Sequence, residues 1–368
     1  MTPKTATASS LPASAHGAMS PLTEVRIERL GPECHEVRDA YLDGHPEATF
    51  FHQSRWESVI GSTFGHEPMT VGAWRGERLV GILPMMLCRT LRGRKNLVSM
   101  PYATYGGPVS DDLGVETALV EWAKAKADEI GVGNLELRWL KEPRDFGMPE
   151  STLYSTFIKD LPENVEDVLS GMPKKARAEA RKARKKHGLE LVEGTWYVDD
   201  LARLFLENKH ALGSPALPAR HFRALMNTFG DDVRVHMVRQ GRDPVSAVMS
   251  FIYKDYLIAY YSGTRQGADR AVSASNFMYL ALQEWCVENG IKTFDFCRSR
   301  GDSGAFRFKV HQGFEPRQLH YQYHLVQNDD LPSFTPSNPK TKILRDTWSK
   351  LPVWMVKPIS DRVSRYLP

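Results

Sequence analysis

The chain has 368 residues, of which 42% are hydrophobic and 25% are charged, and its formal net charge is +4. This length suffices for two ordinary domains, each with its own core, and the composition is that of a globular protein rather than a disordered or fibrous one. The sequence contains no apolar run long enough to span a membrane, and its four cysteines include no C-x-x-C pair, which argues against a disulfide framework or a zinc cluster.

The N-terminal segment, residues 1–22, is rich in Ala, Ser, Thr and Pro. It lacks the continuous apolar core that a secretory signal peptide requires, so we expect a disordered tail and a cytoplasmic protein. The scattered cysteines also suit a reducing compartment.

A recurring order of elements begins at residue 70. The segment TVGAWRGERLVGILPM (70–85) predicts two strands joined by a turn at Arg75–Arg78. The loop PYATYGGP follows, then a helix in ETALVEWAKAKADEIG and a strand in VGNLELRWL. Gly131 stands directly after the last helical residue, where glycine commonly ends a helix.

The same order recurs in the second half of the chain. Residues 234–250 predict a hairpin with its turn at Gln240–Asp243, followed by the loop YLIAYYSGTRQGAD, a helix in SNFMYLALQEWCVENG and a strand in IKTFDFCRS. The repetition indicates two tandem α/β domains of related fold, each a mixed, mainly antiparallel sheet flanked by helices with a βαβ unit at its end. We place these domains at residues 23–165 and 166–330.

A strongly basic linker, residues 172–188, joins the two halves. Pro173 suits the start of a helix and Gly188 suits its end. Only Glu179 opposes the cations Lys174, Lys175, Arg177, Arg181, Lys182, Arg184, Lys185 and Lys186. Two interpretations stay open: a solvated surface helix, or an electrostatic footprint for tRNA, a nucleotide or anionic lipid headgroups.

The C-terminal extension, residues 331–368, interleaves basic and aromatic residues, among them Lys342, Lys357, Trp348 and Trp354. Such a segment, here within residues 337–368, either lies peripherally on an anionic membrane surface or packs back on the first domain as a terminal helix.

Common catalytic motifs do not occur in this sequence. There is no G-x-S-x-G, H-E-x-x-H, Walker loop or Rossmann fingerprint, and the histidines do not cluster at ligand spacing, so we expect no metal and no resident cofactor. The chemistry that remains is group transfer by positioning and electrostatics. The segment RSRGDSGAFRFKVHQGF (298–314) is highly charged and follows the last predicted strand, where ligands gather in open α/β sheets.

Eight segments stand in the order found in FemAB-like proteins: FFHQSRW, LVGILPM, PYATYGGP, GSPALPARHFRAL, AYYSGT, SNFMYLALQEW, FDFCRSR and FRFKVHQGFEP. Over residues 48–326 the chain resembles this family, and it is most similar to the subgroup associated with exopolysaccharide and PEP-CTERM (exosortase) systems. The resemblance implies a tandem pair of GNAT-like (acyl-CoA N-acyltransferase-like) domains, in agreement with the repeat.

The resemblance also implies an activity. FemAB-like proteins are acyl- or aminoacyltransferases whose acceptor is an amine of a cell-envelope precursor, here an exopolysaccharide amino sugar or a peptidoglycan peptide, with lipid-linked forms among the candidates. The implied donor is aminoacyl-tRNA or acyl-CoA. Phe308 and Lys309 match the family's Phe-Lys pair at the transfer site, where the lysine and the adjoining peptide group stabilise the developing oxyanion. Asp295 and Tyr261 are the candidates for taking the proton of the attacking amine.

The matching segments contain the residues that we expect to contact substrate. These are Trp56, Tyr102, Tyr105, Gly106, Arg220, Tyr260, Tyr261, Asn276, Arg298 and Arg300. Gly106 lies in a Gly-Gly-Pro turn whose backbone N–H groups are placed to face a ligand. Arg298 and Arg300 are candidates for holding an anionic substrate. A more ordinary interpretation places Trp56 in the core and uses the two tyrosines of PYATYGGP to cap the sheet.

The chain departs from the family at three points. Residues 195–330 contain no coiled-coil heptads, Ile60 and Gly61 stand where precursor-binding members have a lysine, and RQGADRA (265–271) does not have the spacing of a CoA-binding loop. Two alternatives to the transferase therefore stay open. One is a degenerate GNAT pair that regulates polysaccharide biosynthesis by binding an anionic ligand through 172–188. The other is an RNA-binding protein, whose affinity falls steeply with salt.

Overall fold

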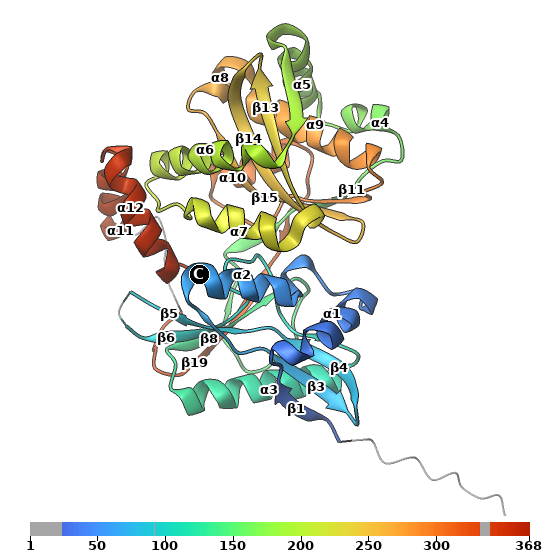
Figure 1. Cartoon of the computed structure of the whole chain (residues 1–368), viewed down its shortest axis with the longest axis vertical. Coiled ribbons are helices and arrows are strands. Elements are labelled where there is room, and N and C mark those ends of the chain that lie inside the picture. Colours follow the sequence, from blue (N-terminus) through green and yellow to red (C-terminus); the bar gives the residue numbers. More distant parts are fainter. Residues whose placement is uncertain (1–23, 92, 332–338) are drawn as a thin grey trace, which may run out of the picture.

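Two α/β units are stacked along the long axis of the molecule in the computed structural model, which describes residues 24–91, 93–331 and 339–368 (Figure 1). The lower unit, blue to teal, contains the first repeat, and the upper unit, green to orange, contains the second. The predicted disordered tail, residues 1–22, lies outside the described residues.

The lower unit contains two sheets. The smaller has the order β1 (Arg26–Arg29), β3 (Val71–Arg75), β4 (Arg78–Leu83), β7 (Val109–Ser110). The larger has the order β2 (Glu67–Pro68), β5 (Met86–Arg89), β6 (Lys95–Ser99), β8 (Asn134–Trp139), β19 (His320–Leu325), β9 (Glu150–Ser151). The helices are α1 (His35–Gly44), α2 (Ser54–Phe64) and α3 (Leu113–Ile130). The predicted hairpin is confirmed as β3–β4, and Gly131 ends α3 with a left-handed φ of 67°.

The upper unit contains a single large sheet with helices around it. Its order is β11 (Ile158–Asp160), β16 (Thr293–Asp295), β15 (Tyr256–Thr264), β14 (Asp243–Tyr253), β13 (Val233–Gln240), β12 (Leu189–Glu193). Its helices are α4 (Val165–Ser170), α5 (Lys174–His187), α6 (Val198–Ala211), α7 (Ala219–Phe229), α8 (Ala268–Val272), α9 (Ala274–Glu288) and α10 (Gly304–His311). The second predicted hairpin is confirmed as β13–β14, where Gln240 pairs with Asp243 at the turn.

Each unit has the predicted βαβ element. In the lower unit β6 runs parallel to β8 with α3 between them, and in the upper unit β15 runs parallel to β16 with α8 and α9 between them. All other ladders in these sheets are antiparallel, as expected for mainly antiparallel sheets. The β15–β16 pairing covers only Tyr256–Ile258 and Thr293–Asp295. Past Asp295, β15 continues while the other strand turns away.

The two units exchange strands. Strand β11, which follows the first repeat in sequence, pairs with β16 of the upper sheet, and β19, which follows the second repeat, pairs with β8 of the lower sheet. Between them, β10 (Tyr154–Thr156) joins β17 (Ser299–Arg300) and β18 (Arg317–Gln318) in a small sheet. The division at residue 165 stays a prediction, since hydrogen bonding crosses it in both directions.

An aromatic cluster links the two units. Phe50 and Trp56, at the start of the α2 region, pack against Phe251 of β14, and the rings of Phe50 and Phe251 stack with centroids 4.5 Å apart. Fully burying side chains of this size stabilises by about 2 kcal/mol each through the hydrophobic effect. This cluster therefore holds the lower and upper units in a fixed relative position.

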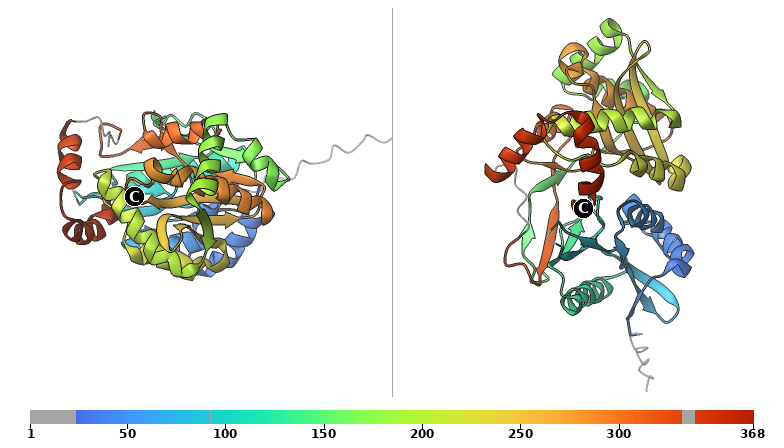
Figure 2. Two further views of the ribbon diagram at one scale, coloured as in Figure 1. Left: turned by 90° about the horizontal axis from the view of Figure 1, so that it is seen from above. Right: turned by 60° about the vertical axis from the view of Figure 1, so that its left-hand side comes forward.

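The basic linker is confirmed as a helix, α5, which begins after Pro173 and ends at Gly188 with a left-handed φ of 60°. Its buried face is made of alanines, Ala176, Ala180 and Ala183. The C-terminal extension forms two helices, α11 (Pro339–Trp348) and α12 (Val353–Val363), at one edge of the molecule (Figure 2). Among the described residues, no helix has both the length and the apolar character needed to cross a bilayer.

Candidate active site

The charged segment begins at a tight turn after β16. Asp295 is the last residue of that strand and is fully buried, and Cys297 adopts a left-handed φ of 59°. The Cys297 N–H donates to Asp295 Oδ1 at 2.7 Å, while the Cys297 carbonyl oxygen accepts from Lys309 Nζ at 2.9 Å. Cys297 therefore hydrogen-bonds to both the Asp295 carboxyl group and the Lys309 ammonium group.

Lys309 comes from α10, whose N-terminus is capped by the Ser303 hydroxyl accepting from the Phe306 N–H. Its Nζ also donates to the Arg298 carbonyl oxygen at 3.2 Å and lies 5.2 Å and 5.3 Å from the ring centroids of Phe157 and Phe296. Burial in this aromatic setting lowers the pKa of Lys309 to about 8, against the opposing influence of Cys297 and Asp295. At neutral pH the group is a buried cation at the carboxyl end of β16.

The Asp295 carboxyl group is placed for proton transfer. Burial raises its pKa to about 7, although the Cys297 N–H, Lys309 and Arg317 act in the opposite direction. Its Oδ2 is buried and has no hydrogen-bond partner among the described residues. A carboxyl group that titrates near neutral pH is suited to accept and return a proton.

The raised pKa makes stability depend on pH. Because the folded chain binds the Asp295 proton more tightly than the unfolded chain, the free energy of unfolding falls as the pH rises from about 4 to about 7. Asp295→Asn removes this titration, so we expect the wild-type chain to lose stability relative to the variant over that window, by up to about 4 kcal/mol. Urea denaturation at both pH values measures the difference. Asp231→Asn, at a side chain that is 97% exposed, is the control and should follow the wild type.

Phe308 is half-buried beside Lys309 on α10. Its ring packs against Tyr279 and Phe296, with centroids 5.8 Å and 6.2 Å away. The Phe308 side chain therefore packs against aromatic residues of the upper unit, while the Lys309 ammonium group contacts the turn at Cys297.

The two predicted anion-binding arginines differ in what they contact. Arg298 donates to the Tyr321 hydroxyl at 2.8 Å, and its guanidinium lies 4.7 Å from the ring centroid of Tyr154. It therefore connects the turn to β19 of the lower sheet. Arg300 pairs with Asp302 at 3.0 Å, and its Nε and Nη1 are buried without a partner among the described residues. Arg300 therefore keeps two unpaired donors that could bind an anion, whereas Arg298 Nη1 is occupied by Tyr321.

The neighbouring tyrosines are engaged within the protein. Tyr260 donates to the Tyr102 carbonyl oxygen at 2.5 Å, and the Tyr261 hydroxyl lies 3.0 Å from His221 Nε2. Burial lowers the pKa of His221 to about 3 and raises the pKa of Tyr261 well above 10. Burial of its phenol argues against Tyr261 as the base, and that role stays a prediction.

Most of the predicted contact residues in the lower unit are buried. The Trp56 indole N–H donates to the Pro101 carbonyl oxygen at 3.2 Å inside the aromatic cluster, and the Tyr102 hydroxyl donates to the Ser364 carbonyl oxygen at 3.0 Å. The structure thus supports the more ordinary interpretation of Trp56 as a core residue. A substrate contact by Trp56 or Tyr102 stays a prediction.

The expectation for the Gly-Gly-Pro turn is wrong in one respect. The N–H groups of Gly106 and Gly107 both donate to the Arg138 carbonyl oxygen, at 3.0 Å and 2.9 Å, so they do not face a ligand. A Cβ at Gly106 would lie 2.7 Å from the Met100 Cβ, so the glycine serves close packing. The turn still borders a cavity through Tyr105 and Gly106.

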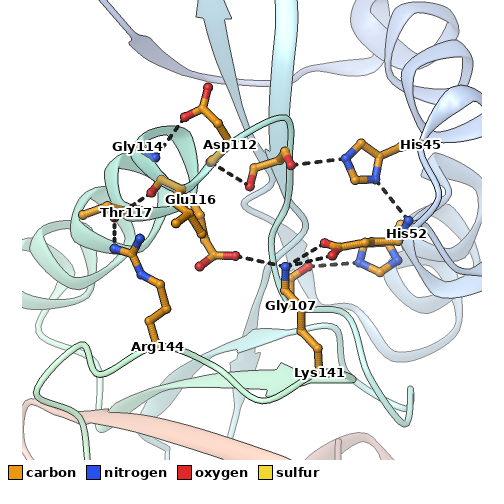
Figure 3. Close-up of polar contacts among 12 residues, drawn as sticks. His45, His52, Gly107, Asp112, Gly114, Glu116, Thr117, Lys141 and Arg144 are labelled. Carbon is orange, nitrogen blue, oxygen red and sulfur yellow. Dashed lines mark hydrogen bonds and ion pairs between the residues drawn. The ribbon is translucent and has the colours of Figure 1, made fainter.

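This first cavity, of about 220 Å³, lies in the lower unit and is lined by polar residues that sequence reasoning missed (Figure 3). Lys141 pairs with Glu47 at 2.8 Å and with the buried Glu116 at 3.4 Å, and His52 Nε2 lies 3.0 Å from the Gly107 carbonyl oxygen. Burial lowers the pKa of His52 to about 4, so this imidazole is neutral. These residues come from separate segments with no shared motif, which left no signal in the sequence.

A second cavity, of about 570 Å³, contains one predicted residue, Arg220 of α7. Arg362 and Arg365, from α12 and the turn after it, line the same cavity with Asp361. Arg365 donates to the Phe64 carbonyl oxygen at 3.0 Å, and Arg220 to that of Thr63 at 3.4 Å, so the last turn of α2 holds both guanidinium groups. The basic residues of the extension were the only sequence signal for Arg362 and Arg365.

Asn276 links three helices. Its Nδ2 donates to Glu179 Oε2 of α5 at 2.8 Å, and its Oδ1 accepts from Gln312 Nε2 at 2.6 Å, directly after α10. The predicted contact residue therefore connects the basic helix to the helix that carries Lys309. Across the described residues there is no group of three His, Cys, Asp or Glu side chains placed to hold a metal.

Comparisons with known proteins show which fold this chain has. Residues 171–310 match the family model for an acetyltransferase (GNAT) domain. The chain is also similar, at 14% identity and a TM-score of 0.51, to a solved tandem GNAT protein from the clavulanic acid biosynthesis pathway, covering 83% of this chain and 100% of that one. The chain has a tandem GNAT fold.

Two further solved structures are similar to this chain in fold. The structure of FemX aligns with a TM-score of 0.63 at 12% identity, covering 82% of this chain and 98% of FemX, and that of L-PGS from Bacillus licheniformis aligns with a TM-score of 0.54 at 12% identity, covering 88% and 99%. No curated protein matches the sequence. The predicted tandem GNAT-like domains are confirmed, whereas the similarity to the exopolysaccharide-associated subgroup stays a prediction.

Proposed function

We propose that the chain transfers an acyl or aminoacyl group to an amine of a cell-envelope precursor, either an exopolysaccharide amino sugar or a peptidoglycan peptide. The observation that carries this proposal is the buried Lys309 ammonium beside the Asp295 carboxyl group, both held by Cys297 at the carboxyl end of β16. This edge is where open α/β sheets bind ligands, and it lies within a matched GNAT domain.

The proposed step has three parts. The neutral amine attacks the carbonyl carbon of an ester or thioester, and the new C–N bond forms as negative charge develops on the carbonyl oxygen. The Lys309 ammonium stabilises this charge, and the C–O or C–S bond to the donor then breaks. The amine's proton passes to the Asp295 carboxylate, which returns it to the leaving group.

The basic helix α5 favours a polyanionic donor, with aminoacyl-tRNA ahead of acyl-CoA. Lys174, Lys175, Arg181, Lys182, Lys185 and Lys186 are exposed on it and have no ion pair within the described chain. Asn276 ties this helix to the segment after α10 through Glu179 and Gln312. A strand of nucleic acid lying on α5 would therefore approach the helix that presents Lys309.

The Arg-lined second cavity supports an acceptor that carries a phosphate group. Arg220 was expected from the resemblance, and Arg362 and Arg365 add two guanidinium groups to the same cavity. These could serve in place of the family's lysine, which is absent at Ile60 and Gly61. Guanidinium groups bind phosphate oxygens in bidentate geometry. A lipid-linked or nucleotide-linked precursor supplies such a group.

The donor is tested by charge reversal on α5. In an assay with aminoacyl-tRNA and acetyl-CoA as alternative donors and lipid-linked amino sugars or peptides as acceptors, we expect Lys182→Glu/Lys185→Glu to raise the KM for aminoacyl-tRNA by about tenfold or more, with a reduced salt dependence. The effect follows from losing two phosphate contacts. Arg78→Glu/Lys292→Glu changes the net charge equally at side chains that are 76% and 78% exposed, and should leave that KM unchanged. Equal effects of the two double variants would refute a tRNA site on α5.

The alternative is a regulatory module that binds an anionic ligand through α5 without catalysis. The free cations of α5 favour it as well. Transfer that depends on Lys309 separates the two proposals, because a binding module has no use for the oxyanion contact. Ligand binding that α5 reversal abolishes, with no transfer from either donor, would support the module instead.

A further inference from the structure

The C-terminal helices α11 and α12 expose an unusual amount of apolar surface. Nearly half of the large exposed hydrophobic residues in the described chain lie in residues 343–368, namely Ile343, Leu344, Val353, Trp354, Met355, Ile359 and Leu367. Ile343, Leu344 and Trp354 are 68%, 69% and 75% exposed. Isolated exposed apolar residues are common, but so many within two consecutive helices indicate an interaction surface.

The larger apolar side chains of α12 lie on its outward face. Residues four apart lie on one face of a helix, and the inward face of α12 carries Val356 and Ser360, which are 0% and 1% exposed. Ser364, directly after the helix, is 2% exposed. The outward face carries Trp354, Met355 and Ile359. The buried face thus combines one apolar residue, Val356, with small serines, while the larger apolar side chains Trp354, Met355 and Ile359 are exposed. Burial within this chain therefore does not explain the apolar outward face.

Basic residues outnumber acidic ones in residues 343–368. Arg345, Lys350, Lys357, Arg362 and Arg365 are opposed only by Asp346 and Asp361 within residues 343–368. The extension is held against both units. The Leu351 carbonyl oxygen accepts from His210 of α6 at 2.9 Å and Arg345 donates to the Leu212 carbonyl oxygen at 3.3 Å, while the Ser364 carbonyl oxygen accepts from Tyr102 of the lower unit at 3.0 Å. The surface is therefore presented at one edge of the molecule, beside the Arg-lined cavity (Figure 2).

We propose that α11 and α12 together form a docking surface for an anionic lipid bilayer. The apolar side chains would enter the acyl-chain region of such a membrane. The surplus of Lys and Arg would contact its negative headgroups. A second copy of this chain fits less well, since two such surfaces would bring like charges together. This inference concerns the membrane alone and does not depend on the chemistry at Lys309.

The test is flotation of the full chain with vesicles of phosphatidylglycerol and phosphatidylcholine, or of phosphatidylcholine alone. We expect binding to the anionic vesicles and about tenfold or more weaker binding to the neutral ones. Ile343→Ser/Leu344→Ser/Trp354→Ser should abolish the binding, and Lys350→Glu/Lys357→Glu should weaken it about tenfold or more because each basic residue near an anionic surface contributes roughly fivefold.

A matched control uses exposed apolar residues elsewhere. Trp196 is 72% exposed and Leu91 is 60% exposed, both outside the extension. Leu91→Ser/Trp196→Ser should bind vesicles like the wild type. The proposal is overturned by an absence of binding to anionic vesicles, by equal loss in both sets of variants, or by a dimer that the triple variant abolishes without any vesicle binding. A catalytically silent protein that still floats would leave this inference intact.

Discussion

Lys309→Met should lower kcat/KM for acyl transfer by about 10²–10³-fold while the chain stays folded. The loss of one preorganised oxyanion donor has this effect on acyl transfer. Methionine is unbranched and apolar, so it fits the aromatic surroundings of Phe157 and Phe296 without leaving a buried charge. The measurement is a steady-state transfer assay with whichever of aminoacyl-tRNA and acetyl-CoA supports transfer by the wild type, together with thermal unfolding of both proteins.

The control for this variant lies two residues away on the same helix. Arg307 is exposed on α10, and within the described residues it donates only to the Asp302 carbonyl oxygen, at 3.3 Å. Arg307→Met makes a similar change in charge and should keep kcat/KM within about twofold, since surface substitutions of this kind have small effects. Transfer by Lys309→Met at more than a tenth of the wild-type rate would remove Lys309 from the proposed mechanism.

Glu57→Gln should destabilise the fold by about 3–5 kcal/mol, the cost of leaving one partner of a buried ion pair unpaired. Arg38 Nη1 donates to Glu57 Oε1 at 2.8 Å, and the two side chains are 1% and 4% exposed. Thr70 donates to the same carboxylate oxygen, and Arg38 also donates to the His52 carbonyl oxygen at 2.6 Å. The pair thus fixes α1, α2 and the segment that carries His52 in the lower unit. Chemical denaturation measures the loss.

Two companion variants sharpen this result. Glu129→Gln breaks the pair between Lys126 and a glutamate side chain that is 68% exposed, and should cost less than about 1 kcal/mol. Arg38→Met/Glu57→Gln removes both buried charges and should recover part of the stability lost in the single variant. If Glu57→Gln costs no more than Glu129→Gln, the buried pair does not hold the lower unit together.

The repeat allowed much of the fold to be predicted. Alternating apolar residues on either side of Arg75–Arg78 and Gln240–Asp243 predict hairpins. Gly131 predicts a helix end because glycine readily adopts the positive φ found there. These are local effects, decided within a few residues. The exchange of β11 and β19 between the sheets was not predictable in the same way, because neither strand's own pattern says which sheet edge it will pair with.

The candidate site shows the same division between local features, which could be predicted, and long-range contacts, which could not. The sequence alone determined a tandem α/β chain, a basic helix between its halves, and a charged segment after the last strand of the second repeat. Only the tertiary structure decided that Lys309 and Asp295 meet at Cys297, that Trp56 and Tyr261 are buried, and that Arg362 and Arg365 join Arg220 around one cavity. The physical reason is range: hydrogen-bonded turns and helix ends form between near neighbours in the chain. Burial, the pKa shifts that follow from it, and cavities depend on segments that only folding brings together.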